Sequence, residues 1–529
     1  MSRKPDHREQ APGRQAEPPP RPVAVLDLGT TAVRLTIAEI AADGKVRRLE
    51  DLQQAVNLGR DVFAEGAISK ATIEECVRAL RGFRAVLTEY EVSGPNSVRA
   101  VATTAVREAS NRQAFCDRIY MATGFDLELL ENADIARLTY LSMHDDFAGG
   151  PAFKDSDLVV AEVSGGNTEL LVLRRGAVAF SQSQSLGSYR MREMLELFHT
   201  PLGRRRRVME TNIQRTLDQI LADVTLKQPR MLVALGGDAR LAAGQLAPDW
   251  DQSAPAELTL RALRRLTEDV LGLSSEEVVG RFHVSFPDAE TLGPALLVYV
   301  RMARALGLRK ILVSKATTRH GLLLEMAAAG SWTKEFAAQI VQSVLELGRR
   351  YRFDAKHARH VERLSKTLFA ALQIEHRLAP RYELLLRVAA LLHDLGRFIS
   401  QRSHHKHSHY VIKNSELFGL PPRDALLVAL TARYHRRASP KPSHDDYPNL
   451  TREERLVVTR LAAILRVAEA LDRSHSQRVR DISCELAKDK LVIRIPGVSD
   501  LSLEELALSQ KGSLFEDVYG MPVVLRRGR

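Results

Sequence analysis

Two copies of one local pattern constrain the fold of this chain more than any other feature. Each copy is an apolar run, a polar turn that contains glycine, and a second apolar run: VAVLDLGTTAVRLTIAEI from Val23 and LVVAEVSGGNTELLVL over 158–173. The β-branched runs predict strands, and the glycine turns predict tight reversals between them. Helical periodicity at 69–89 and 111–122 alternates with such strands, which predicts an α/β architecture of two related lobes.

The character of the sequence changes after about residue 330, from alternating strands and helices to nearly continuous helix. The length of 529 residues also favours several domains, because single cores stop growing near ~250–300 residues. Short alternating segments after Asp481 predict a small α/β tail, and the proline-rich, charged first residues are typical of disorder. We therefore expect five parts: a disordered tail at 1–21, a first lobe at 22–150, a second lobe at 151–328, an all-α domain at 329–480 and a small α/β segment at 481–529.

The net charge of +11 predicts attraction to polyanions, a class that includes nucleic acid, inorganic polyphosphate and phosphorylated nucleotides. The low aromatic content of 5% argues against a dedicated nucleic-acid reader, because such modules stack bases on aromatic rings. The three cysteines form no CxxC pair, so a disulfide framework is not indicated and a reducing cytoplasm fits best. No apolar run approaches the ~20 residues that a membrane span needs.

The two glycine turns supply the groups that a phosphate clamp needs. Glycine lets the backbone approach an anion and direct successive N–H groups at its oxygens, and hydroxyl or amide side chains add neutral donors. Carboxylates beside a polyanion repel it unless they hold a cation, so Asp27 and Glu162 are expected to anchor Mg²⁺ through water. An ordinary hairpin is the alternative for either turn taken alone. The candidate phosphate-binding residues are Gly29, Thr30, Thr31, Gly165, Gly166, Asn167 and Thr168.

Several stretches resemble the family of exopolyphosphatases and guanosine pentaphosphate phosphohydrolases. DLGTTAVRL is similar to the family's DxGSNSxRL-like opening, EVSGGNTEL to its DIGGGSTE-like turn, and ATTAVREA at 102–109 to its ATRA-x-R-x-A stretch. The Gly236-Gly237 turn and SKATTRHGLL from Ser314 match as well, so the resemblance covers residues 22 to 325. It implies the actin-like fold of sugar kinases, Hsp70 and actin, in which two lobes close on phosphate with Mg²⁺ present. It also implies that Arg107 holds a phosphate bidentately.

One departure concerns the family's catalytic glutamate, which stands in a stretch similar to ISGxEEARL. The matching segment here is LENADIARL, and Ile135 occupies the position of that glutamate. Isoleucine cannot accept a proton from water, so the expected general base is missing. Asp134 is adjacent, but neighbouring helical residues point about 100° apart, and it would need a local shift to act. Glu169, which ends the second turn, is retained, and the candidate catalytic residues are therefore Asp134 and Glu169.

The helical part carries histidines and aspartates in the order H…HD…H…H…D, which resembles the HD phosphohydrolase superfamily. Imidazoles and carboxylates on neighbouring helices suit one or two metal ions that activate water for phosphate-ester hydrolysis. The resemblance implies a divalent transition metal such as Mn or Fe, and Glu469 is a rival for Asp472 as a ligand. His360, His404 and His409 are interpreted as solvated or satisfied side chains. The implied ligands are His357, His393, Asp394 and Asp472 for a first metal and His407 and His435 for a second.

These observations favour a cytoplasmic phosphoanhydride hydrolase that releases orthophosphate from the ends of inorganic polyphosphate. A phosphohydrolase of guanosine pentaphosphate or another nucleotide is the first alternative, including through the HD domain. A regulator that binds polyphosphate or a guanosine alarmone without cleaving it is the second, and Ile135 favours it. The expected partner is polyphosphate or such an alarmone, with no membrane and no specific nucleic acid, and a homodimer is compatible with the sequence.

Overall fold

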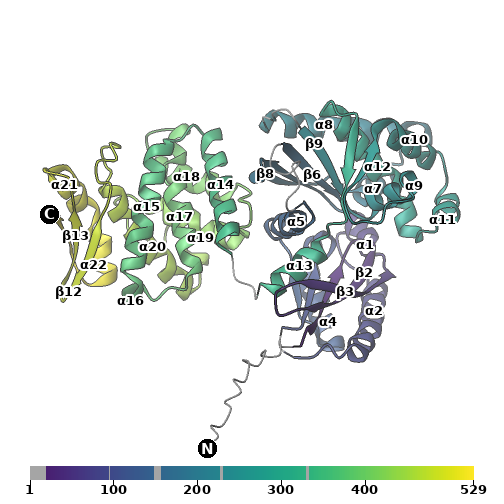
Figure 1. Cartoon of the computed structure of the whole chain (residues 1–529), viewed down its shortest axis with the longest axis horizontal. Helices are drawn as coiled ribbons and strands as arrows, with labels where there is room; N and C mark the ends of the chain where they lie inside the picture. Colours follow the sequence, from purple (N-terminus) through teal and green to yellow (C-terminus); the bar gives the residue numbers. More distant parts are fainter. Residues whose placement is uncertain are drawn as a thin grey trace, which may run out of the picture.

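The computed structural model describes residues 19–94, 96–147, 156–224, 226, 230–328 and 333–528. Two α/β lobes lie one above the other, and a helical domain lies beside them (Figure 1). Most of the predicted tail at 1–21 lies outside the described residues, and Arg21 already begins the first strand.

The first lobe is built on a sheet with the strand order β3-β2-β1-β4-β5. β1, β2 and β3 pair antiparallel through the glycine turn, whereas β4 and β5 continue the sheet in parallel on the other side of β1. The strands are β1 (Arg21–Leu28), β2 (Ala32–Ile40), β3 (Val46–Ala55), β4 (Val98–Ala102) and β5 (Leu127–Leu129).

The second lobe repeats this topology. Its order is β10-β11-β9-β6-β7-β8, in which β6, β7 and β8 pair antiparallel and β9 and β11 add in parallel. β6 therefore corresponds to β1, and β10 is an extra antiparallel edge strand. This duplication gives the two related lobes that the recurring turns predict, in the actin-like arrangement that the family resemblance implies. The strands are β6 (Asp157–Val163), β7 (Thr168–Arg174), β8 (Ala177–Gln184), β9 (Arg230–Leu235), β10 (Ala256–Thr259) and β11 (Lys310–Val313).

Helices bury the apolar faces of both sheets. One face of the first sheet packs on α2 and α4, and the other packs on α5 and α13, where Val23 and Val25 contact Leu138 and Leu322. The helices of the lobes are α1 (Leu58–Glu65), α2 (Lys70–Glu89), α3 (Thr104–Glu108), α4 (Arg112–Thr123), α5 (Asn132–Phe147), α7 (Ser188–Leu197), α8 (Leu202–Asp223), α9 (Gly237–Leu246), α10 (Leu260–Leu271), α11 (Ser275–Phe282), α12 (Phe286–Ala305) and α13 (Thr318–Ala327).

The helical domain shares a continuous apolar core with the outer face of the second sheet. Phe336 and Phe418 pack against Tyr140 of α5, and the backbone N–H of Val178 donates to Gln339 Oε1 at 3.0 Å. The domain is therefore docked on the lobes rather than tethered by a linker alone. Its helices are α14 (Lys334–Arg350), α15 (Ala355–Ala371), α16 (Gln373–His376), α17 (Arg381–Leu392), α18 (His404–Lys413), α19 (Pro422–Arg433) and α20 (Arg452–Ala470).

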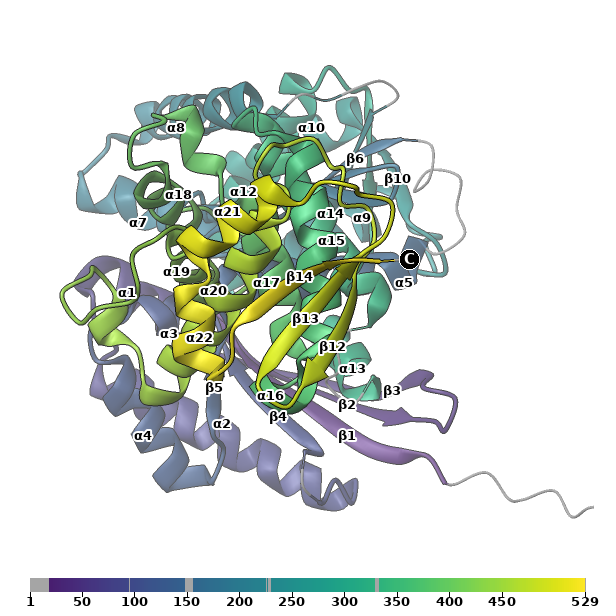
Figure 2. The same ribbon diagram turned by 90° about the vertical axis from the view of Figure 1, so that its left-hand side faces the viewer.

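A small C-terminal segment covers the side of the helical domain that is turned away from the two lobes, and it faces the viewer in Figure 2. Its sheet has the order β12-β13-β14, and its two helices pack on α20. In the described part of the chain, no helix combines the length and apolarity that crossing a bilayer requires. The elements are β12 (Ser483–Ala487), β13 (Lys490–Ile495), α21 (Ser502–Lys511), α22 (Ser513–Tyr519) and β14 (Val523–Arg527).

Candidate functional site

A cleft of about 340 Å³ lies where the two glycine turns meet. A Cβ on Gly165 would stand 2.7 Å from Thr30 Cγ2, and one on Gly187 would stand 2.2 Å from the carbonyl carbon of Gly166. Side chains cannot fit at such separations, so Gly165 lets the second turn pack on the Thr30 side chain of the first, and Gly187, the N-cap of α7, lets that helix pack on the backbone of the second turn. Asp27 and Glu162 lie at the ends of the equivalent strands β1 and β6, and both line the cleft.

The structure divides the predicted phosphate-binding residues into two groups. Gly29, Thr30, Thr31 and Gly165 line the cleft, whereas Gly166, Asn167 and Thr168 do not. Asn167 Nδ2 donates to Ser183 Oγ at 3.0 Å, and the Thr168 hydroxyl donates to the carbonyl of Leu186 at 2.6 Å. These two side chains therefore fix the shape of the second turn and do not face a ligand.

Three arginines, Arg34, Arg240 and Arg319, supply positive charge to the cleft. Desolvation by burial lowers the pKa of Arg240 and of Arg319, and nearby carboxylates oppose that effect. Arg240 Nη1 is buried without a hydrogen-bond partner among the described residues, so it is available to an anion. Arg34 and Arg319 stand in stretches that match the family. Arg240, which the sequence-based prediction missed, follows the Gly236-Gly237 turn, and that turn is the signal that could have revealed it.

Arg107, expected to hold phosphate, is turned away from this cleft. Its guanidinium donates to the backbone carbonyl of Leu130 and, at 2.7 Å, to Asn132 Oδ1. It is absent from the residues that line the cleft. In this arrangement Arg107 braces the start of α5.

The residue at the position of the family's catalytic glutamate, Ile135, presents an apolar side chain to the cleft. Ile135 lines the cleft and is 6% exposed. The carboxylate of Asp134 instead accepts hydrogen bonds from the backbone N–H of Glu131 at 3.1 Å and from Arg137 at 3.2 Å. Asp134 caps the helix start and does not line the cleft, so the structure corrects its proposed role as a substitute base.

Glu169, the second catalytic candidate, does line the cleft. Burial raises its pKa to about 8, and a hydrogen bond from the Ser183 hydroxyl at 2.6 Å opposes the shift. The backbone N–H of Ser183 donates at 3.0 Å to Glu416, a residue that follows α18 in the helical domain. The helical domain therefore reaches the hydrogen-bond network behind this carboxyl group.

A second site lies in the helical domain, where imidazole rings converge on Asp394. His393, His404 and His435 each present Nδ1 to a backbone carbonyl three residues earlier, at 2.8, 3.1 and 2.7 Å. Donation from Nδ1 leaves the lone pair on Nε2, and the Nε2 atoms of His404 and His435 face each other at 3.3 Å. Two facing lone pairs repel unless a cation lies beside them. A backbone partner on the other ring nitrogen is also the usual arrangement of a metal-ligating histidine.

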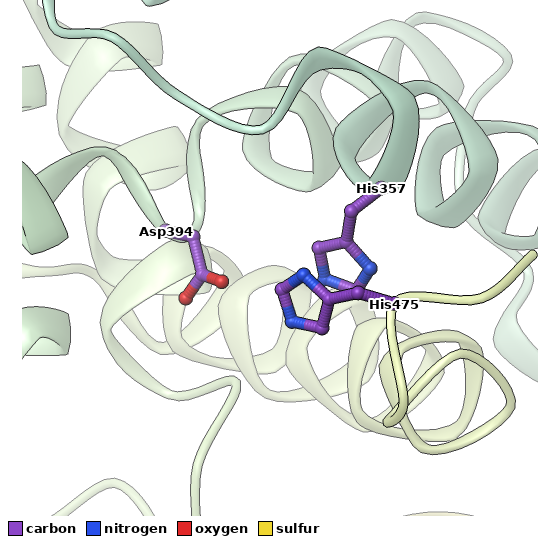
Figure 3. Close-up of side chains that lie close together, drawn as sticks. All are labelled: His357, Asp394 and His475. Carbon is purple, nitrogen blue, oxygen red and sulfur yellow. The ribbon is translucent and has the colours of Figure 1, made fainter.

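His357 and His475 form the other side of this cluster (Figure 3). The two rings stack at 3.6 Å, and Asp472 Oδ2 holds His357 Nδ1 at 2.8 Å. The Nε2 atoms of His357 and His393 and both oxygens of Asp394 are buried without a hydrogen-bond partner among the described residues. The candidate ligand groups, each within 4.8 Å, are His357, Asp394 and His475, and Asp394, His404 and His435.

The donor set fits one or two divalent transition metal ions, because neutral imidazoles and a carboxylate are ligands that Zn, Fe and Mn accept. Burial lowers the pKa of His393 to about 4 and that of His435 well below its usual value, so both rings are in the neutral, metal-binding form at neutral pH. His357, His393, Asp394, His435 and Asp472 thus lie together, as the resemblance implies.

Five ligand assignments change in the structure. His393 and Asp472, both predicted as ligands, belong to neither candidate group, although Asp472 holds His357. His407 belongs to neither group, and His404, expected to be a satisfied side chain, takes its place beside His435. His475 was missed, although it stands three residues after Asp472. Glu469 contacts Lys511 and lies 3.3 Å from Arg473, whereas Asp472 holds His357, so Asp472 is the member of this pair that serves the cluster.

The two lobes repeat one sheet topology, and their cleft is lined by glycine turns, arginines and carboxylates. This combination defines an actin-like phosphate-binding protein. The chain joins it to a helical domain whose histidines and Asp394 have metal-ligand geometry. The chain belongs to the Ppx/GppA phosphatase family: the family model matches residues 36–329, and the model of Ppx/GppA phosphatase, domain III, matches residues 341–512. The expected family and fold are thereby confirmed.

Relatives of known sequence or structure agree with this assignment. A guanosine-5'-triphosphate,3'-diphosphate pyrophosphatase of Photobacterium profundum is 22% identical over 516 residues, which cover 95% of this chain and 97% of that protein. The crystal structure of an exopolyphosphatase from Cytophaga hutchinsonii has 22% identity and a TM-score of 0.53, and covers 58% of this chain and 98% of that one. At these identities the structural likeness shows the fold alone.

Proposed function

We propose that the cleft between the lobes hydrolyses the terminal phosphoanhydride bond of inorganic polyphosphate and releases orthophosphate. The observation that carries this proposal is the convergence of Arg34, Arg240 and Arg319 with both glycine turns on one cavity. Guanidinium groups and backbone N–H donors recognise phosphate oxygens, and a polyphosphate chain offers nothing else to recognise.

The lining of the cleft favours polyphosphate over a guanosine alarmone. Among the described residues that line it there is no phenylalanine, tyrosine or tryptophan on which a guanine base could stack. The relative from Photobacterium profundum bears the name of a guanosine-nucleotide pyrophosphatase, so the alarmone is the comparison substrate. Polyphosphate is expected to give the higher kcat/KM.

Asp27 and Glu162 fit a Mg²⁺ site in this cleft. Burial raises the pKa of Glu162 and the neighbouring charge of Asp27 adds to the effect, which a cation between the two carboxylates would reverse. Bound Mg²⁺ would neutralise charge on the phosphates during hydrolysis. The protein groups meanwhile hold the terminal phosphate, with the arginines at its oxygens and the turns behind it.

Phosphate release from long-chain polyphosphate in the presence of Mg²⁺ tests the proposal. Arg240→Gln is expected to lower kcat/KM about 10–150-fold, the effect of losing one charged hydrogen bond of about 1.5–3 kcal/mol. Arg215→Gln, an exposed change on α8, is the matched control. Absence of release from the wild type, or equal rates in both variants, would refute the assignment.

The facing Nε2 atoms of His404 and His435 favour a second, metal-dependent phosphate-ester hydrolase in the helical domain. Its residues would bind a nucleotide phosphate near Asp394, where Arg397 Nε lies 2.9 Å from the carboxylate. Release of p-nitrophenol from p-nitrophenyl phosphate with Mn²⁺ is expected to fall in Asp394→Asn and to persist in Arg240→Gln. The opposite pattern, with activity lost only in Arg240→Gln, would remove this second function.

A further inference from the structure

The cleft needs a group that removes a proton from the attacking water, and this question rests on the proposed function. Ile135 supplies no such group, and Asp134 is turned away. The acidic side chains that line the cleft among the described residues are Asp27, Glu162, Glu169, Asp238 and Asp288. The base is to be found within this set.

Four of these five carboxylates either accept a hydrogen bond from a side chain or have a place in the cation site. Asp27 and Glu162 fit the cation site, and Glu169 is held by the Ser183 hydroxyl at 2.6 Å. Asp288 accepts a hydrogen bond from Ser285 at 2.7 Å and longer ones from Thr31 and Gln53, both at 3.4 Å. These bonds hold Asp288 as a bridge between the lobes rather than as a free acceptor.

Asp238 is the remaining member, and its carboxylate meets no hydrogen-bond donor in the described part of the chain. It stands in the first turn of α9, directly after the Gly236-Gly237 turn. Gly236 adopts a φ of 99°, and a Cβ there would lie 3.3 Å from the carbonyl oxygen of Val163 and 3.8 Å from Glu162 Cγ. The turn thus packs on the end of β6, which places Asp238 at the same cavity as the cation site.

The groups around Asp238 suit a proton acceptor. Arg34 of β2 and Arg240 of α9 are its positive neighbours, Asp288 is its negative neighbour, and Tyr299 of α12 lies on the same side. Burial raises the pKa of Asp238 to about 7, with a further contribution from Asp288, and the two arginines oppose this. A general base is most effective when its pKa lies near the working pH.

We propose that Asp238 is the general base of the cleft and replaces the carboxylate lost at Ile135. The Asp238 carboxylate takes one proton from the water whose oxygen forms a bond to the terminal phosphorus. The bond from that phosphorus to the bridging oxygen breaks, and the oxygen leaves as the new end of the shortened chain beside the arginines. Orthophosphate departs, and the proton on Asp238 passes to solvent.

Phosphate release and polyphosphate binding by Asp238→Asn test the assignment, with Asp249→Asn, an exposed change beyond α9, as the matched control. Asp238→Asn is expected to lower kcat about 10²–10⁴-fold while the polyphosphate Kd changes less than about threefold. The rise of kcat/KM through neutral pH is expected to disappear. Adding Ile135→Glu to Asp238→Asn places a carboxylate at another residue that lines the cleft and is expected to recover at least a tenth of the lost rate.

If the wild type releases phosphate, two results would overturn the role of Asp238 and leave the proposed function intact. One is an unchanged kcat and pH profile in Asp238→Asn, and the other is a loss confined to Kd, which would make Asp238 a binding residue. A wild type that releases no phosphate would instead refute the proposed function on which the inference rests. Circular dichroism of both variants separates a loss of catalysis from a loss of folding.

Discussion

Replacing His435 by alanine is expected to remove most of the stabilisation that a divalent transition metal gives to the folded chain. His435 Nε2 lies 3.3 Å from His404 Nε2 and 3.8 Å from Asp394 Oδ1, in a group of three candidate ligands. The alanine variant keeps only two ligands of that group. It also leaves a cavity at a side chain that is 1% exposed, so the metal-free protein is destabilised as well, and only the metal-dependent part of the stability is compared.

The magnitude follows from linkage between metal binding and folding. A ligand present at 100 times its dissociation constant stabilises the folded state by about 2.7 kcal/mol. Loss of a coordinating ring that raises the dissociation constant about 100-fold leaves about 0.4 kcal/mol at the same metal concentration. The metal-dependent part of the free energy of unfolding is therefore expected to fall by about 2.3 kcal/mol in His435→Ala.

Calorimetric titration with Mn²⁺ and urea unfolding with and without the metal provide the assay. His199→Ala, an exposed change at the end of α7, is the control and is expected to match the wild type. A metal-induced stabilisation of His435→Ala equal to that of the wild type would refute the reasoning, because the group of Asp394, His404 and His435 would then not be the binding site.

Three further predictions concern acid stability, packing of the turns and the contact between domains. His393 has its pKa lowered to about 4 from an ordinary 6.5, so the folded metal-free protein binds fewer protons than the unfolded chain. The neutral His393 ring therefore contributes about 3 kcal/mol to the free energy of unfolding above pH 6.5, and this contribution is lost as the pH falls towards 4. Urea unfolding of the metal-free protein at pH 7.5 and at pH 5 measures the difference. Gly187→Ala is expected to cost about 1–3 kcal/mol and to slow phosphate release, whereas Gly82→Ala in open space on α2 stabilises by about 0.5–1 kcal/mol. Equal stabilities of the two alanine variants would contradict the close packing of Gly187 on the second turn. Glu416→Ala removes a negative neighbour that raises the pKa of Glu169, so NMR titration should show that pKa moved downward.

The architecture could be predicted from the sequence because its signals are local. A glycine turn between two β-branched runs predicts the start of each lobe, and the alternating order of strands and helices predicts an α/β topology. Asp27, Thr30 and Gly165 were found in the same way, since a turn that joins two central strands must lie at the edge of its sheet. Asp394, which belongs to both candidate ligand groups, was likewise predicted from its place beside His393.

The orientation of single side chains was decided only by the tertiary structure. Arg107 and Asp134 stand in the expected stretches, yet Asn132 and Arg137 hold them away from the cleft. His404 and His407 share a histidine-rich helix, and packing of α18 on α19 determines which ring meets His435. A strand or turn is specified by neighbours in the chain, whereas the direction of a side chain depends on partners that only folding brings near.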